Sequence, residues 1–345
     1  MQGKLPRPVT MKDVAAAAQV SSATVSRVLS GKSTVDPEMA KRVHEAVEAT
    51  GYVPNFMGMA LRRQVTNTWA IIVSNIENPF FTRLVASMEE AAEYLGYSVM
   101  LCNTNEQVDR ENRYINAVIQ RRMSGVAIAA ASAVRTDLTP LTRAGIPVVL
   151  IDRLVQGYDG DSVVVDNALI GRLAAEHFAA QGYRRFGCVA GPRHVSSMAH
   201  RLEGFRTALR ERGIDLPNAM VSQTDLRGDS GEFSVANMLN QPDAPDAIFS
   251  GYGVTTAGAY RAIKGRGLSM PRDIGLVGTD DEAWMTLVQP SVTVIRQPVE
   301  QIGIAAAQLL NARSAHPDSP SQHLVLQPTL VERESSRGFA NHRTA

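Results

Sequence analysis

Residues 10 to 29 read T-M-K-D-V-A-A-A-A-Q-V-S-S-A-T-V-S-R-V-L and predict two short helices joined by a tight turn. Thr10 and Asp13 have the spacing of a capping box, in which side-chain oxygens accept hydrogen bonds from the unpaired amides at a helix start. The first helix carries an apolar stripe at helical spacing, formed by Val14, Ala17 and Ala18. These small side chains allow a second helix to cross the first at close range.

The second helix is expected to begin after Ser21, whose hydroxyl is a good N-cap. Its apolar face consists of Val25, Val28 and Leu29. Its other face is polar and small, and together with Ser21 and Thr10 it forms the predicted DNA contact surface: Ser22, Ala23, Thr24, Ser26 and Arg27. Hydroxyls suit phosphates, small side chains allow close approach, and an arginine matches guanine O6 and N7, so this pattern is typical of a recognition helix. The alternative is that two short amphipathic helices are ordinary core.

A third helix and the charge distribution favour the DNA-binding interpretation. Asp36 and Pro37 are typical of a helix start, and Thr50 with Gly51 is typical of a helix end. Residues 1–64 carry nine Lys or Arg and five Asp or Glu, a net charge of +4, whereas the whole chain carries +1. The remainder is therefore at −3. A basic end on an acidic body is a common electrostatic feature of nucleic-acid-binding proteins.

Four motifs identify a known family. They are V-T-M-K-D-V-A (9–15), V-S-S-A-T-V-S-R-V-L (20–29), G-Y-V-P-N (51–55) and N-P-F-F-T-R-L-V (78–85). In their order and spacing the chain resembles the LacI/GalR family of bacterial transcriptional regulators over essentially all of its 345 residues. Gln19 departs from the family, whose members usually carry glycine in this turn. If the position has a positive φ, glutamine costs about 1 kcal/mol there.

The segment after the third helix is predicted to be a hinge, residues 53–66. A helix from Asn55 to about Arg63 is too short to be stable alone and contains Gly58. It is therefore expected to fold only when two copies meet on DNA, and Asn55 is expected to contact that DNA. The resemblance implies that Leu61 inserts into the minor groove and kinks the duplex. The alternative is a plain flexible linker between domains.

Residues beyond Thr68 alternate apolar strand-like runs with helical stretches, which predicts an α/β fold with parallel sheets. The runs are 69–73, 97–102, 125–130, 146–151, 185–190, 246–250 and 274–278, with a final strand at 323–327. So many strands require two sheets. The resemblance implies a body, residues 67–345, with two lobes of the periplasmic-binding-protein kind and passages between them near 165, 292 and 325. The lobes would comprise about 67–164 with 293–324, and about 165–292 with 325–335. The headpiece is residues 1–52.

The carboxyl ends of parallel strands are where such sheets bind ligands. Carboxylates, an arginine and aromatic side chains are predicted to converge there as an effector site: Asn75, Phe80, Phe81, Asp152, Arg201, Tyr252 and Asp280. Asp oxygens accept from hydroxyls, arginine donates to ring oxygens and phenylalanine stacks on apolar faces, which suits a sugar or a nucleoside. The resemblance implies effector contacts for the positions of Asp152, Arg201 and Asp280.

One departure affects the expected effector. Where the family often has Asn-Asp after the strand at 247–250, this chain has Gly251-Tyr252-Gly253. Two polar groups that hold sugar hydroxyls are therefore missing, while Tyr252 could stack on the ligand or donate its hydroxyl. The effector is expected to be a different sugar derivative, or a sugar acid bound by Arg153 and Arg201.

Two other classes of protein remain as alternatives: a cytoplasmic sugar-binding or nucleotide-binding protein, and an enzyme on the same two-lobed body. Gly251 and Gly253 resemble the start of a phosphate-binding loop, but Thr256 stands where the third glycine belongs. Asp280, Asp281 or Asp152 could act as general acids, yet no catalytic triad or metal motif accompanies them, and the seven histidines do not cluster. Neither a cofactor nor a catalytic or metal site is expected.

The sequence shows no apolar leader at its start and no run of 18 apolar residues, which predicts a cytoplasmic protein without a membrane partner. Cys102 and Cys188 are expected to be reduced and buried. The tail after Val331 has no leucine heptads, so a homodimer is expected rather than a tetramer. We therefore expect a repressor, and not an enzyme, that binds a palindromic double-stranded DNA operator as a dimer. A small-molecule effector, a sugar or sugar derivative, would control it from the cleft between the lobes.

Overall fold

The computed structural model describes residues 7, 9–29, 35–52, 66–226 and 228–338. The chain divides into two units, Met1–Thr66 and Asn67–Ala345, which we call the head and the body. The predicted hinge residues 53–65, with Asn55 and Leu61, lie outside the described residues.

The described part of the head contains three helices, α1 (Met11–Ala18), α2 (Ser22–Leu29) and α3 (Pro37–Thr50). They enclose a small apolar core that consists of Val14, Ala15, Ala18, Val25, Val28, Val43, Ala46 and Tyr52. Ala17 was expected in this core and is exposed, while Ala15 is buried instead. Both residues lie beside the Val14 and Ala18 stripe, and only the packing of α1 against α3 decides which side faces inward.

The helix ends of the head follow the predicted signals. The Thr10 amide donates to Asp13 Oδ2 at 2.7 Å, which satisfies an amide at the start of α1. Asp36 Oδ1 accepts from the amides of Glu38 and Met39 at the start of α3. Gly51 ends α3 with φ 64°, a conformation that glycine adopts without strain. Local hydrogen bonds therefore set these helix boundaries.

Gln19 has the positive φ, 53°, that its place in the turn suggested. We expect Gln19→Gly to stabilise the head by about 1 kcal/mol, because glycine removes the steric strain of this left-handed conformation. Hydrogen exchange on the full chain measures this change as roughly fivefold greater protection of the buried amides of α1 and α3. Ala16→Gly, in the middle of α1, is the control and should reduce protection. Equal behaviour of the two variants would contradict the strain argument.

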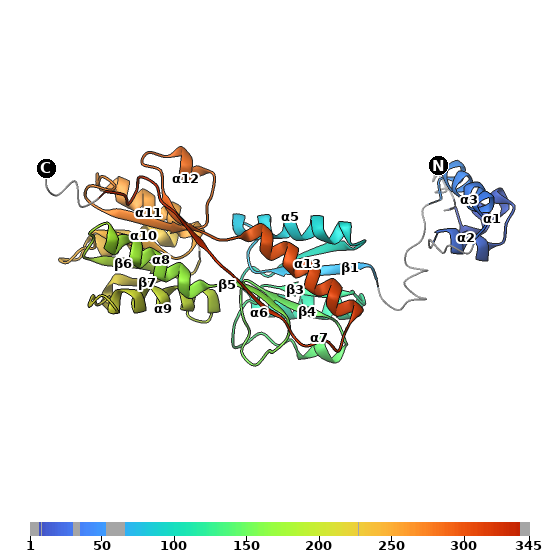
Figure 1. Ribbon diagram of the computed structural model, residues 1–345, viewed down its shortest axis with the longest axis horizontal. Coiled ribbons are helices and arrows are strands. Elements are labelled where there is room, and N and C mark those ends of the chain that lie inside the picture. Colours follow the sequence, from blue (N-terminus) through green and yellow to red (C-terminus); the bar gives the residue numbers. More distant parts are fainter. Residues whose placement is uncertain (1–6, 8, 30–34, 53–65, 227, 339–345) are drawn as a thin grey trace, which may run out of the picture. The chain divides into compact units, whose positions relative to one another are not determined.

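The body is built on two sheets, seen in Figure 1. The first sheet has the order β11-β5-β4-β3-β1-β2 and is parallel throughout. Its strands are β1 (Thr68–Val73), β2 (Ser98–Asn103), β3 (Gly125–Ile128), β4 (Val148–Ile151), β5 (Ser162–Val165) and β11 (His323–Leu326). The second sheet has the order β12-β10-β9-β8-β6-β7, and only its edge strand β12 is antiparallel to its neighbour. Its strands are β6 (Phe186–Ala190), β7 (Val221–Gln223), β8 (Ala247–Ser250), β9 (Gly275–Thr279), β10 (Thr293–Arg296) and β12 (Thr329–Val331).

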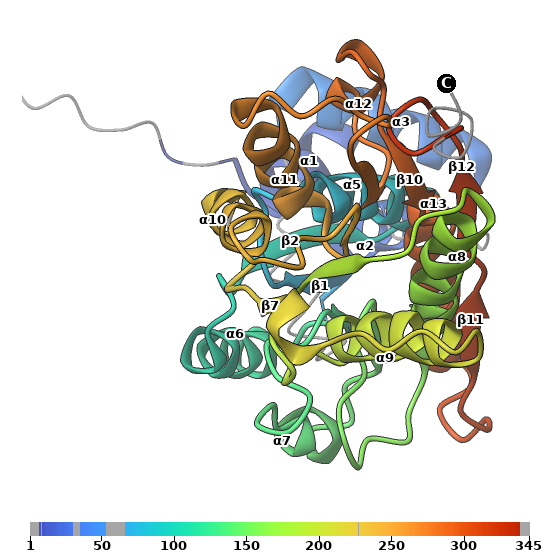
Figure 2. The same ribbon diagram turned by 90° about the vertical axis from the view of Figure 1, so that its left-hand side faces the viewer.

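Helices cover both faces of each sheet and form two lobes. The helices of the first lobe are α5 (Pro79–Tyr94), α6 (Val108–Gln120), α7 (Thr139–Arg143) and α13 (Val299–Ala315). Those of the second lobe are α8 (Asn167–Ala180), α9 (Ser196–Arg210), α10 (Gly228–Leu239), α11 (Gly253–Gly265) and α12 (Trp284–Leu287), with a short 3-10 turn at Asn218–Met220. Figure 2 shows α8 and α9 on one side of the second sheet and α10 and α11 on the other.

Alternate residues of the buried strands serve opposite faces of the first sheet. Ile71 belongs to the apolar cluster that includes α5 and α13, whereas Ile72 belongs to the cluster that includes α6 and α7. Continuous apolar runs are therefore required, as parallel strands covered on both faces predict. The α/β architecture is confirmed, and each predicted strand is present.

Four further strands were not predicted, namely β5, β7, β10 and β12. This affects the expected passages between the lobes. Since β10 pairs with β9, the second passage lies after Arg296 and not at 292, so that expectation was one strand too early. The third passage lies between β11 and β12. Within the described ranges no helix has the length and apolar character needed to span a membrane.

Candidate functional site

The outer face of α2 is accessible for contact with a partner. The side chains predicted to contact DNA divide into the exposed Ser21, Ser22, Ala23 and Arg27 and the half-buried Thr10, Thr24 and Ser26. Val25 and Val28, on the opposite face, are buried. Ser21 Oγ accepts from the Thr24 amide at 3.1 Å and so caps the helix. The first turn of α2, the part of a recognition helix that contacts base edges, is thus both held and exposed.

In the body, a buried polar cluster forms where the strands of both lobes end. Asp152 and Arg153 follow β4, Tyr252 follows β8, Asp280 follows β9, and Arg201 lies on α9. Each of these five residues is at most 6% exposed. Four ionisable groups buried together require partners, because an unpaired charge in such surroundings is strongly unfavourable.

Arg201 organises the part of the cluster that belongs to the second lobe. Its Nε donates to Asn167 Oδ1 at 2.8 Å, its Nη1 to the Gly251 carbonyl at 2.9 Å and its Nη2 to Gln297 Oε1 at 3.0 Å. Gln297 in turn donates to Asp280 Oδ1 at 2.6 Å. This network joins residues that follow β5, β8, β9 and β10 to helix α9.

Arg153 organises the part that belongs to the first lobe. Its two terminal nitrogens donate to the two carboxylate oxygens of Glu106 at 2.7 and 2.8 Å, and Nη1 also donates to the Ala130 carbonyl at 3.1 Å. Its Nε lies 3.3 Å from Asp152 Oδ2. The guanidinium is therefore placed between two carboxylates.

The electrostatics show that the two halves of the cluster affect one another. Burial raises the pKa of the Asp152 carboxyl, while the Arg153 and Arg201 guanidiniums oppose this rise. Burial also raises the pKa of Asp280, and Arg201 is the main charge that opposes it. Burial lowers the pKa of Arg201. Strongly perturbed ionisable groups that act on one another in a cleft are typical of functional sites.

Two of the carboxylates stand on strained backbone. Asp152 has φ 62° and Asp280 has φ 68°, and each directly follows its strand. Aspartate tolerates a left-handed conformation better than most residues other than glycine, but the conformation is still uncommon for it. Such strain concentrates at functional sites, where the surrounding structure holds it in place.

Polar contacts bridge the two lobes around this cluster. Asn78 Nδ2 donates to the Tyr252 hydroxyl at 2.9 Å, the Ala133 amide to the His194 carbonyl at 2.9 Å, and the Leu154 amide to Ser196 Oγ at 2.9 Å. Tyr252 also packs against the apolar residues Val195, Met198 and Leu226. The lobes are thus in direct contact in this structure.

The other predicted effector residues have mixed positions. Asn75 is half-buried and accepts from the Glu77 amide at 3.0 Å, as in a local turn. Phe80 and Phe81 are both in the apolar core, with their rings edge to face at 5.1 Å. Phe81 lies 5.9 Å from the Arg153 guanidinium carbon, which places it beside the polar cluster. For each of the predicted residues, contact with an effector stays a prediction.

Three residues of the cluster were missed in the sequence. Asn167 and Gln297 follow the short strands β5 and β10. Because these strands were not predicted, there was no reason in the sequence to place the polar side chains after them at the ends of strands. Glu106 lies only a few residues beyond the recognised strand β2. Its position after that strand was the available signal, but its partner Arg153 lies 47 residues further along the chain.

Several buried polar atoms near these strand ends have no hydrogen-bond partner in the part of the chain that the structure describes. They include Ser74 Oγ and Ser197 Oγ. Ser74 follows β1, and Ser197 precedes Arg201 by one helical turn on the same face of α9. Unpaired buried groups of this kind are suited to bind a polar ligand.

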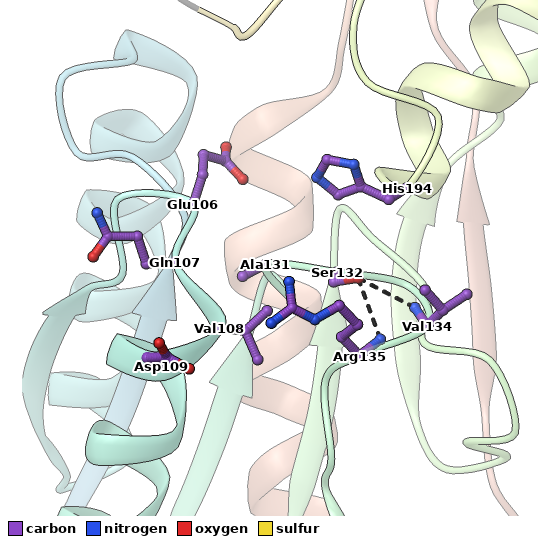
Figure 3. A pocket seen from close by; sticks show the side chains of 9 residues that line it. All are labelled: Glu106, Gln107, Val108, Asp109, Ala131, Ser132, Val134, Arg135 and His194. Carbon is purple, nitrogen blue, oxygen red and sulfur yellow. Dashed lines mark hydrogen bonds between the residues drawn. The ribbon is translucent and has the colours of Figure 1, made fainter.

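A pocket of about 440 Å³ opens beside the cluster, shown in Figure 3. It is lined by Glu106, Gln107, Val108, Asp109, Ala131, Ser132, Val134, Arg135 and His194. All of these residues belong to the first lobe except His194, which lies in the loop before α9. Ser132 Oγ accepts from the amides of Val134 and Arg135 at 3.4 and 3.2 Å, which holds the loop after β3.

The groups considered for enzyme chemistry have structural partners instead. Asp281 accepts from Arg296 and Arg333 at 2.5–2.9 Å. The Gly251 carbonyl accepts from Arg201, and the Gly253 amide donates to Asp280. This loop therefore binds the protein's own side chains and does not form a phosphate cradle. Among the residues with described positions, no group of three His, Cys, Asp or Glu is arranged to hold a metal ion.

Comparison with known families divides the chain as its fold does. Residues 10–55 match the family described as "Bacterial regulatory proteins, lacI family". Residues 175–336 match the family described as "Periplasmic binding protein-like domain". The first match contains α1 to α3, and the second contains most of the second lobe together with α13 and β11.

Relatives and solved structures resemble nearly the whole chain. The ribose operon repressor of Escherichia coli (strain K12) is 31% identical over 330 residues, which cover 95% of this chain and 99% of that protein. A lac repressor dimer bound to operator and the anti-inducer ONPF superposes with a TM-score of 0.87 at 26% identity, covering 96% of this chain and all of that one. A complex of the transcriptional regulator CelR with cellobiose gives a TM-score of 0.73 at 30% identity, with 96% and 100% covered.

Proposed function

The chain belongs to the LacI family of bacterial regulatory proteins, and we propose that it is a repressor whose body senses a small polyhydroxylated effector. It binds operator DNA sequence-specifically through its head, as a homodimer. The observation that carries this proposal is the exposure of Ser22, Ala23 and Arg27 on α2, opposite the buried Val25 and Val28. The lac repressor dimer on its operator supports the same use of the head.

The head and body are proposed to communicate through the hinge. We assign residues 1–52 to the DNA-binding headpiece, 53–66 to the hinge and 67–345 to the body, with Asn55 in contact with DNA and Leu61 inserted at the centre of the operator. A chromosomal target supports a cytoplasmic location. Two heads held by one dimeric body raise each other's effective concentration on a two-fold symmetric site, which compensates for the small surface of each head.

The effector is proposed to bind at the buried cluster between the lobes. Asp152, Asp280 and Arg201, with Tyr252, Asn75, Phe80 and Phe81 around them, supply acceptors, donors and apolar faces for a sugar. One relative is named a ribose operon repressor, and a similar transcriptional regulator was solved in complex with cellobiose, which supports this class of ligand. Effector binding would change the contact between the two lobes. It would thereby change the spacing of the two hinges in the dimer. Such a coupling is typically about 1–3 kcal/mol.

The test is operator binding with and without candidate effectors. A duplex selected from a random 20-base-pair pool with the full-length protein is titrated by fluorescence anisotropy at two salt concentrations. We expect tight binding with steep salt dependence, altered by one neutral sugar of a panel of pentoses and hexoses. Failure to select any duplex, together with salt-independent binding, would contradict the repressor function.

Arg27→Ala is expected to weaken binding to the selected operator by about 1–3 kcal/mol and to relax base preference at one position in each half-site. The reason is that a bidentate arginine contact to guanine carries sequence information. Lys12→Ala, an exposed residue on α1, is the matched control. It should weaken all sequences alike and reduce the salt slope by about 1. An unchanged base preference in Arg27→Ala would show that Arg27 does not contribute to base recognition.

A further inference from the structure

The positive charge of Arg153 is already neutralised by the protein itself. Arg153 is 2% exposed, and both of its terminal nitrogens donate to the carboxylate of Glu106, at 2.7 and 2.8 Å. Two parallel charge-assisted hydrogen bonds form the strongest pairing available to a guanidinium. The same group would otherwise be the natural partner of an acidic ligand, so its commitment to Glu106 changes what the cleft can bind.

Glu106 is held in this position by its own backbone. Asn105 and Glu106 have consecutive positive φ angles of 52° and 59°. The Glu106 amide donates to the Ser74 carbonyl at 2.9 Å, which ties the loop after β2 to the end of β1. Two successive left-handed residues other than glycine persist only where the surroundings determine them. The ion pair is therefore part of the fold and not an incidental surface contact.

The carboxylate also lies on the open side of Arg153. The side chain of Glu106 is 23% exposed, compared with 2% for Arg153. Glu106 lines the 440 Å³ pocket together with Ser132 and His194, whereas Arg153 is not among the lining residues (Figure 3). A molecule in the pocket therefore meets a carboxylate before it can reach the guanidinium.

The charges of the whole cluster also disfavour an anionic ligand. Arg153 and Arg201 face three carboxylates, those of Glu106, Asp152 and Asp280. Arg83 acts on Asp280 and adds one positive charge. Asp280 in turn acts on Glu282, which adds one negative charge. Glu111, which is buried, also interacts with Arg153, so carboxyl groups outnumber guanidiniums in the cluster. An anionic ligand would have to separate a bidentate pair and then remain beside the displaced carboxylate.

We propose that Glu106 determines specificity: by occupying Arg153 it reserves the cleft for neutral polyhydroxylated effectors and excludes their carboxylate-bearing or phosphate-bearing counterparts. The proposal rests on the proposed effector function of this cleft. It decides between the two ligand classes that the sequence left open, a neutral sugar derivative and a sugar acid. A neutral ligand brings no charge that competes with Glu106 for Arg153, so it can bind without separating the pair.

The experiment compares matched ligands that differ in one charged group. The pairs are glucose with glucuronate, galactose with galacturonate, and ribose with ribose 5-phosphate, because each retains the same type of sugar ring. Their affinities are measured by calorimetry on the native full-length chain, on Glu106→Gln and on Asp109→Asn. Asp109 lines the same pocket but lies outside the Arg153 pair, so its variant is the matched control for loss of one negative charge.

We expect the native chain to bind the neutral member of one pair at least tenfold more tightly than its charged partner. Glu106→Gln should reduce this ratio at least tenfold, and Asp109→Asn should leave it unchanged. Equal or tighter native binding of the charged member would overturn the proposal, and it would do so even if the Glu106 variant failed to fold. An unchanged ratio in folded Glu106→Gln would also overturn it. Both of these outcomes leave the effector function standing, whereas no binding by any pair, with operator binding intact, would contradict that function too.

Discussion

Replacing Arg201 with alanine is expected to abolish the effector response and to weaken effector binding at least about a hundredfold, while operator binding persists. Arg201 joins Asn167, the Gly251 carbonyl and Gln297 through three hydrogen bonds, and Gln297 positions Asp280. Without the guanidinium, three buried acceptors lose their donor. The head does not depend on this network, so its DNA contacts should remain.

The same variant is expected to lower the stability of the body by about 3–5 kcal/mol, because three buried acceptors lose their donor and the buried Asp152 and Asp280 lose a nearby positive charge. The loss should depend on pH. Burial already raises the pKa of Asp280, and Arg201 is the main charge that opposes this rise. In Arg201→Ala the pKa of folded Asp280 rises further, so the folded state binds a proton at pH values where the unfolded state does not. The variant should therefore be less destabilised at pH 5 than at pH 7.

The measurements are effector-dependent anisotropy on the selected operator and urea unfolding at both pH values. Arg210→Ala, an exposed arginine in the last turn of the same helix α9, is the control and should behave as the native chain. Arg201→Lys keeps the charge without the planar fork and should retain more stability than alanine but little effector affinity. A full effector response in both Arg201 variants would place the effector elsewhere.

Gly171→Ala is expected to destabilise the body by about 2–3 kcal/mol through a clash between two helices. A Cβ at Gly171 on α8 would overlap the backbone carbonyl of Arg201 on α9, and a Cβ at Gly204 on α9 would overlap the Ala168 carbonyl on α8. The two helices therefore approach through a reciprocal pair of glycines. Since the atom struck is the backbone of Arg201, the effector site should be displaced as well.

Urea unfolding followed by the fluorescence of Trp69 and Trp284 measures this loss, and calorimetry measures the accompanying decrease in effector affinity. Gly265→Ala is the matched control, because it also lies on a helix but has open space around it. Alanine there should leave stability unchanged or raise it by up to about 1 kcal/mol. If Gly171→Ala proved as stable as Gly265→Ala, the close approach of α8 and α9 would not be a constraint on this fold.

Local patterns in the sequence were sufficient to predict the helices of the head, most of the strands and the α/β class of the fold. The capping signals of the head and the apolar runs of the strands follow from interactions within a few residues. The polar residues after recognised strands, such as Asp152 and Asp280, could also be placed at one edge of each sheet. In the same way Ser21 could be assigned as a cap, and the side of α2 opposite Val25 and Val28 as the exposed side of the helix.

Only the tertiary structure decided which of these side chains have partners and what they are. Ala15 replaces Ala17 in the core of the head because α1 packs with that side toward its neighbours. The pairs Arg153–Glu106 and Arg201–Gln297 join residues 47 and 96 positions apart. Spacing along the chain carries no information on such pairs, because they depend on the order of strands in the sheets and on the contact between the lobes. For the same reason the sequence showed a cleft with two arginines, whereas the structure shows that one of them is already neutralised by Glu106.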